Sequence, residues 1–159
     1  MNVSRRALIL SAGAGALGTA LPFRRSFSDP KIKEYRLNAE ANTVNLTGHG
    51  HPDTAVWAYN GTVPGPEIRV RQGAPVRIVV NNKLGEDTTV HWHGVRLPNA
   101  MDGVPGLTQK PVRASESFTY EFTPPDAGTF WYHPHADTLQ QLGRGLAGSL
   151  IVGKRAACC

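Results

Sequence analysis

All six histidines of this 159-residue chain occur in His-x-His pairs: His49/His51, His91/His93 and His133/His135. Successive side chains of a β-strand alternate between its two faces, so residues i and i+2 point the same way. A His-x-His strand therefore directs two imidazoles to one point, and two such strands side by side can bring four imidazoles together. Imidazole-rich sites suit copper, zinc, iron or nickel, so the residues predict a transition-metal site without choosing the metal.

Two of the three pairs have the setting of a strand. His91 and His93 flank Trp92 in an apolar segment, and Gly94 after them permits a close approach of backbone. His133-Pro134-His135 follows the aromatic residues 130–132. Pro134 cannot donate a ladder hydrogen bond, so this pair is expected where its strand leaves the sheet. The candidate metal ligands are therefore His91, His93, His133 and His135.

The third pair, His49-Gly50-His51, lies between Gly48 and Pro52. Glycine and proline on both sides are typical of a turn, so we interpret this pair as a solvated turn, with metal binding as the alternative.

The elements that must position these histidines are short alternating segments separated by Gly, Pro, Asn and Asp turns. In 34–46, the apolar residues Tyr35, Leu37, Ala39 and Ala41 share one face. Further segments are predicted at 68–70, 76–80, 90–95, 118–122, 129–133 and 149–152, with one short helix within 137–144. About seven short strands with regular turns predict an all-β fold, a single antiparallel Greek-key sandwich or barrel.

The N-terminus predicts export. Residues 1–20 combine Arg5 and Arg6 with 14 apolar or small residues, which is typical of a signal peptide, either twin-arginine or general secretory. A membrane-spanning helix needs about 20 apolar residues, so no stable span is expected. Residues 21–32 are interpreted as a linker. The mature protein is expected to be periplasmic or secreted.

The formal charge of +5 does not indicate a nucleic-acid partner. Without Arg5 and Arg6, the 17 basic residues fall to 15, against 12 acidic ones, and these charges are scattered. A weakly basic, solvated surface is the simpler interpretation.

Several motifs together resemble the first, plastocyanin-like (cupredoxin) domain of a multicopper oxidase, most closely the bacterial laccase-like and copper-efflux oxidases. The resemblance covers residues 34–153 and rests on residues 59–66 (Tyr-Asn-Gly-Thr-Val-Pro-Gly-Pro), 90–94 (Val-His-Trp-His-Gly), 101–106 (Met-Asp-Gly-Val-Pro-Gly), 118–122, 128–135 and 145–152. It implies that copper is the metal, that residues 33–153 form one cupredoxin domain, and that this domain supplies half of the histidines of a three-copper cluster.

The resemblance also implies individual roles. His91 would bind the type 2 copper, His93 and His133 one type 3 copper, and His135 the other. Asp102 would be catalytic, delivering protons to bound dioxygen; the alternative is a turn-forming Asp-Gly pair. Trp92, Trp131 and Tyr132 are expected either to shape the pocket or to belong to the core.

One departure from the family limits the expected function. A type 1 copper site requires a cysteine, two histidines and usually an axial methionine, but the only cysteines are Cys158 and Cys159. We therefore expect residues 154–159 to be an atypical tail and the chain to be truncated. It would require missing C-terminal cupredoxin domains before it could couple oxidation of a reducing substrate to reduction of dioxygen. The alternatives are a non-catalytic metal-binding module and, less in keeping with the retained histidines, a copper-free scaffold.

Overall fold

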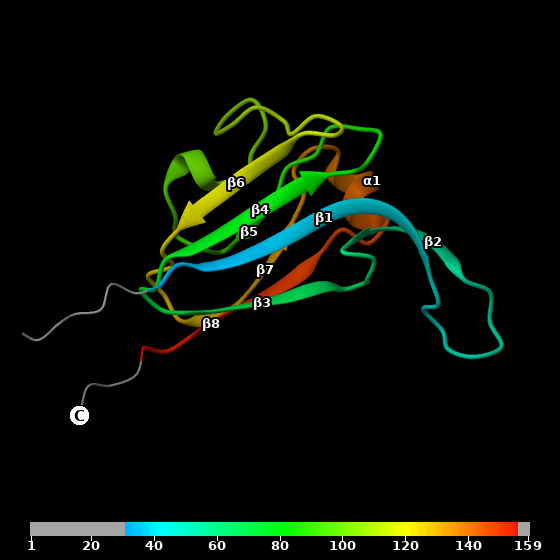
Figure 1. The fold of residues 1–159 in the computed structure, drawn as a ribbon, viewed down its shortest axis with the longest axis horizontal. Helices are drawn as coiled ribbons and strands as arrows, with labels where there is room; N and C mark the ends of the chain where they lie inside the picture. The colour runs from blue at the N-terminus through cyan, green and yellow to red at the C-terminus, as the bar shows by residue number, and fades with distance from the viewer. Residues whose placement is uncertain (1–30, 156–159) are drawn as a thin grey trace, which may run out of the picture.

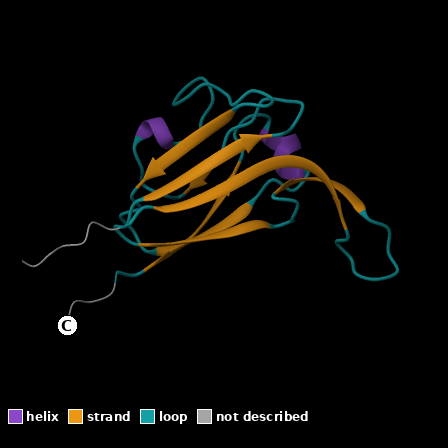
Figure 2. Ribbon diagram, viewed as in Figure 1, coloured by secondary structure: helices purple, strands orange, loops and turns teal. Residues whose placement is uncertain are grey.

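A computed structural model describes residues 31–155, which form a sandwich of two four-stranded sheets (Figures 1 and 2). The elements are β1 (Lys33–Val44), β2 (Thr54–Tyr59), β3 (Gly65–Arg71), β4 (Val76–Asn82), β5 (His91–His93), η1 (Asn99–Met101), β6 (Ser117–Phe122), β7 (Gly128–His133), α1 (Thr138–Gly143) and β8 (Gly148–Gly153). The predicted all-β sandwich is confirmed. Neither helix within residues 31–155 is long and apolar enough to cross a membrane. The predicted signal peptide, most of the linker, and Cys158 and Cys159 lie outside the described residues.

The two sheets are mixed rather than purely antiparallel. One has the order β2-β1-β4-β6 and the other β3-β8-β7-β5. Strands β1 and β4 pair in parallel, as do β3 and β8. A parallel pair requires a long connection outside the sheet. Here, the chain passes through β2 and β3 between β1 and β4, and through four further strands between β3 and β8, so the local turn signals did not reveal these pairings.

The hairpin of β1 and β2 projects from one end of the sandwich (Figure 1). Because β1 continues beyond the core, Ala41 is exposed, although Tyr35, Leu37 and Ala39 turn inward as predicted. Strand β2 was not predicted, because its apolar run does not alternate: the guanidinium of Arg144 lies 4.4 Å from the Trp57 ring centroid and covers that outward indole. His49 and His51 are exposed in the connecting loop, as expected.

Aromatic side chains fill the space between the sheets behind β5. The Trp92 ring lies 5.3 Å from that of Tyr120, 5.2 Å from that of Phe122 and 5.8 Å from that of Tyr132. Tyr120 belongs to the opposite sheet, and its hydroxyl accepts a hydrogen bond from the backbone N–H of Val90 at 3.0 Å. Burial raises the pKa of Tyr120 to about 12, so its phenol stays neutral and ties the two sheets together directly before β5.

Tyr132 requires a glycine beside it. Its hydroxyl donates to the carbonyl of Pro66 at 2.7 Å, and a Cβ atom at Gly148 would collide with its ring. We expect Gly148→Ala to lower the free energy of unfolding by about 1–3 kcal/mol, the usual cost of overpacking a core. Urea denaturation measures this change. Gly85→Ala is the matched control, because an added Cβ there meets nothing within 4 Å; equal stability of the two variants would contradict the prediction.

Candidate metal centre

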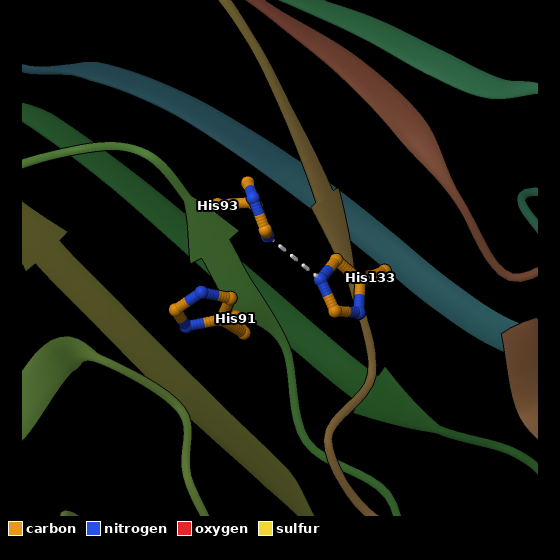
Figure 3. A group of neighbouring side chains, drawn as sticks. All are labelled: His91, His93 and His133. Atoms are coloured by element: carbon orange, nitrogen blue, oxygen red, sulfur yellow. Dashed lines mark hydrogen bonds between the residues drawn. The ribbon is translucent and has the colours of Figure 1, made fainter. Parts of the chain in front are cut away.

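The register of β5 against β7 places the candidate ligands on one face of the sheet. His91 pairs with His133, Trp92 with Tyr132 and His93 with Trp131. Trp92 and Tyr132 are fully buried in the core. Because side chains alternate along a strand, His91, His93, His133 and Trp131 lie together on the opposite, outer face. Figure 3 shows the three imidazoles converging from the two strands.

Three of the four predicted ligands form a compact set. One ligand nitrogen from each of His91, His93 and His133 lies within 4.8 Å of the other two. His93 Nδ1 and His133 Nε2 face each other within hydrogen-bond distance, at 3.4 Å (Figure 3). Two imidazole nitrogens that each lie about 2.0–2.1 Å from one four-coordinate ion are separated by about 3.3–3.4 Å. The His93/His133 pair is therefore already at a chelating distance.

His135 lies beside this set and is positioned by its backbone. Its ring centroid is 4.4 Å from that of His91 and 5.1 Å from that of His133. Strand β7 ends at His133, so His135 lies beyond the last ladder pair, as Pro134 predicted. The backbone N–H of His135 donates instead to Thr89 Oγ1 at 3.1 Å. All four predicted histidines thus gather at one place.

Backbone carbonyls decide which ring nitrogen is free on two of the imidazoles. His91 Nδ1 lies 2.8 Å from the carbonyl oxygen of Asp102, and His133 Nδ1 lies 3.0 Å from that of Pro134. A carbonyl can only accept, so each Nδ1 carries the hydrogen and each Nε2 lone pair is left for a metal. For His133, this is the nitrogen that faces His93.

Asp102 contacts His91 through its side chain as well. Its Oδ1 lies 3.3 Å from His91 Nδ1, and the carboxylate is partly buried. The turn that brings Asp102 this close requires Gly103: the φ angle of Gly103 is +78°, and a Cβ atom there would collide with the carbonyl of Val90. The Asp-Gly pair is therefore a turn former that also contacts a candidate ligand.

A buried side-chain amide holds the segment before β5 against α1, and sequence reasoning did not predict this contact. Gln141 is fully buried; its Oε1 accepts from Thr88 Oγ1 at 2.7 Å, and its Nε2 donates to the Asp87 carbonyl at 2.8 Å. Thr89 follows directly and receives the bond from His135. A glutamine in a short helix and two threonines before a strand have no diagnostic spacing, so only the fold reveals that they support the site.

Burial keeps part of the cluster in its neutral form. His133 is only 5% exposed, and desolvation, followed by the nearby imidazoles, lowers its pKa. Desolvation, and then the charge of His91, also lowers the pKa of His135. A neutral imidazole is the form that binds a metal ion. The environment therefore favours metal binding at neutral pH.

Comparison with known proteins identifies the family. The multicopper oxidase family model matches residues 40–157. The chain belongs to the multicopper oxidase family. It is 35% identical to copper resistance protein A of Escherichia coli over 165 residues, covering 98% of this chain and 26% of that protein. It is 41% identical to laccase-2 of Botryotinia fuckeliana over 123 residues, covering 76% of this chain and 20% of that protein.

Solved structures of multicopper oxidases agree with the observed fold. The crystal structure of a multi-copper oxidase from Pseudomonas thermotolerans superposes with a TM-score of 0.72 at 49% identity, covering 79% of this chain and 30% of that one. The blue copper oxidase of Nitrosomonas europaea gives a TM-score of 0.74 at 35% identity, covering 80% of this chain and 41% of that one. This chain, which has the cupredoxin-like fold of a multicopper oxidase domain, spans between about a fifth and about a quarter of the length of these curated relatives.

The residues present fit copper. The set of His91, His93 and His133 offers three imidazole nitrogens, two of them at a chelating distance, and imidazole is a preferred ligand of copper. Orientation of a ligand ring by a hydrogen bond from its second nitrogen, seen at His91 and His133, is a general feature of metal-binding histidines.

The lowered pKa values of His133 and His135 predict a pH-dependent stability of the metal-free chain. Below the ordinary histidine value of 6.5, the unfolded chain binds protons that the folded chain resists, so the free energy of unfolding should fall as the pH decreases from 6.5 through the folded pKa values. Urea unfolding between pH 7.5 and 5 measures this slope. A His133→Ala/His135→Ala double variant should lose part of it; an unchanged slope would show that these two imidazoles do not cause it.

Proposed function

We propose that this chain is the copper-binding first domain of an exported multicopper oxidase and supplies half of the ligands of its three-copper cluster. The observation that carries this proposal is the outer-face set of His91, His93 and His133, with two donor nitrogens 3.4 Å apart. In this proposal, residues 33–153 are the cupredoxin domain, residues 1–20 direct export to the periplasm or beyond, and residues 21–32 are a linker.

The ligand roles follow from the geometry together with the family pattern. His93 and His133, whose nitrogens are at a chelating distance, would share one type 3 copper. His91, whose Nδ1 is engaged by the Asp102 carbonyl and whose Nε2 is left free, would hold the type 2 copper. His135, whose ring lies beside that of His91, would serve the second type 3 copper.

Copper bound at these residues would supply the one-electron chemistry that couples oxidation of a reducing substrate to reduction of dioxygen to water. Four histidines of this chain would serve as copper ligands, and neighbouring groups of the chain orient them. Asp102 would add a general acid. Its carboxylate oxygen Oδ1 lies 3.3 Å from His91 Nδ1, and this position beside the candidate ligands supports a role in delivering protons to bound dioxygen. The remaining ligands and the type 1 copper site would come from further cupredoxin domains that cover the exposed face around His93 and Trp131.

A non-catalytic copper-binding module is a second candidate. The set of His91, His93 and His133 is contributed entirely by this chain and needs no second domain to assemble. Such a module would bind copper without catalysing the oxidation of a substrate.

Copper stoichiometry tests the site directly. The purified chain, carrying Cys158→Ser and Cys159→Ser so that these thiols do not compete for the ion, is loaded with Cu²⁺, dialysed and analysed by atomic absorption. We expect His91→Ala and His133→Ala each to reduce the bound copper by half or more, because each removes a ligand from a shared set. The His49→Ala/His51→Ala double variant, at the exposed hairpin loop, is the matched control and should retain it.

Bound copper that is insensitive to both His91→Ala and His133→Ala would contradict the proposed site. Oxygen consumption with a phenolic substrate tests the need for further domains: the chain alone should show none. Sustained copper-dependent turnover by the chain alone would refute the view that further domains are required.

A further inference from the structure

We propose that Trp131 is a positioning residue that holds the donor nitrogens of His93 and His133 at their chelating distance; this inference rests on the proposed copper site. Trp131 occupies the fourth corner of the grid that β5 and β7 form on the outer face. It lies directly opposite His93 in the ladder and two residues before His133 on its own strand. The other three corners are the imidazoles of the compact set.

The indole contacts both members of the chelating pair. Its ring stacks on that of His133 with the centroids 4.1 Å apart and the planes inclined by 23°, and lies 4.9 Å from the His93 ring at 36°. By contrast, the His91 ring stands nearly perpendicular to that of His93, at 86°, and steeply inclined to that of His133, at 74°. The His93 and His133 rings are themselves inclined to each other by 41°, and Trp131 contacts both of them.

Burial in the core does not explain this indole. Trp131 is 37% exposed, whereas Tyr132, which follows it in sequence, and Trp92, the ladder partner of Tyr132, are fully buried on the inner face. Aromatic pairs at such distances attract each other beyond the effect of the area they bury, so the stack biases the rotamers of both histidines.

His93 needs a neighbouring aromatic ring because of its position in the sheet. His93 is exposed on β5, an edge strand of the sheet, and its Nδ1 faces His133 rather than a backbone carbonyl. Backbone carbonyl groups orient the rings of His91 and His133, whereas the neighbouring indole of Trp131 orients the ring of His93. Without the indole, the His93 ring would be free to rotate toward solvent. Copper binding would then cost the conformational entropy lost on ordering this ring.

The test compares Trp131→Leu, which removes the aromatic ring beside His93 and His133, with Trp131→Phe, which keeps a stacking ring. Both are made in the 159-residue chain with Cys158→Ser and Cys159→Ser. Trp57→Leu, at a partly buried indole on β2, is the matched control. The measurements are Cu²⁺ affinity by competition with a chelator, the Cu²⁺ EPR spectrum, and thermal unfolding without metal.

We expect Trp131→Leu to weaken Cu²⁺ binding by about 10–100-fold, as for other residues that orient metal ligands, and to broaden the EPR spectrum into several species. Trp131→Phe should restore most of the affinity and a single EPR species, and Trp57→Leu should leave both unchanged. A purely structural role would instead lower the unfolding temperature and leave the EPR spectrum of the copper-loaded variant unaltered.

Affinity of Trp131→Leu within twofold of the parent, with an unchanged EPR spectrum, would overturn the positioning role while leaving the copper site intact. The same holds if Trp131→Phe is as impaired as Trp131→Leu, since a stacking ring would then not suffice. Failure of the parent chain to bind Cu²⁺ would overturn the proposed function and, with it, this inference.

Discussion

The two-residue period of side chains along β5 and β7 is the constraint on which the site depends. The same alternation that sends His91, His93 and His133 outward sends Trp92 and Tyr132 into the core. A register slip of one residue would expose two large aromatic rings and bury the imidazoles, at a prohibitive cost. The packing of the sandwich therefore specifies the candidate metal site, because the register that fills the core is also the register that gathers the histidines.

Alternation along the strands brings the imidazoles together, and backbone groups then help to orient them. The carbonyls of Asp102 and Pro134 select the tautomers of His91 and His133, and the N–H of His135 is held by Thr89. These contacts come from three segments that are distant in sequence: the approach to β5, the turn at Gly103 and the exit from β7. They can meet only because Gln141 and Tyr120 fix the approach to β5 from α1 and from the opposite sheet. Orientation of the ligands is thus a property of the whole domain.

The sequence predicted the all-β sandwich and the gathering of the histidines, because both depend on local periodicity and on strongly punctuating residues. Pro134 marked the exit of β7, and the two apolar His-x-His segments indicated the four histidines that gather at the candidate site. It did not predict strand β2, since Arg144 covers an outward Trp57 and removes the expected polar alternation. It did not predict the parallel pairs, which depend on long connections rather than on turns.

Finer features of the site were also beyond the sequence. The expectation for Trp92, Trp131 and Tyr132 did not separate them, because parity along a strand indicates which residues share a face but not which face is inside. The structure separates Trp131 from the other two. Support from Gln141 and Thr89 depends on hydrogen bonds between residues 40 to 60 positions apart, and their residue types carry no motif.

The brevity of β5 has a consequence for how its face is recognised. This strand has three residues and lies at the end of its sheet, next to β7. A long free edge invites strand addition from any extended chain, which is a common route to aggregation. Three residues offer too few backbone groups for that kind of pairing to be stable. A protein that covers this edge must therefore contact the imidazoles and the indole rather than the peptide backbone, which makes the contact selective. The exposed edge is, for the same reason, a poor template for nonspecific strand addition.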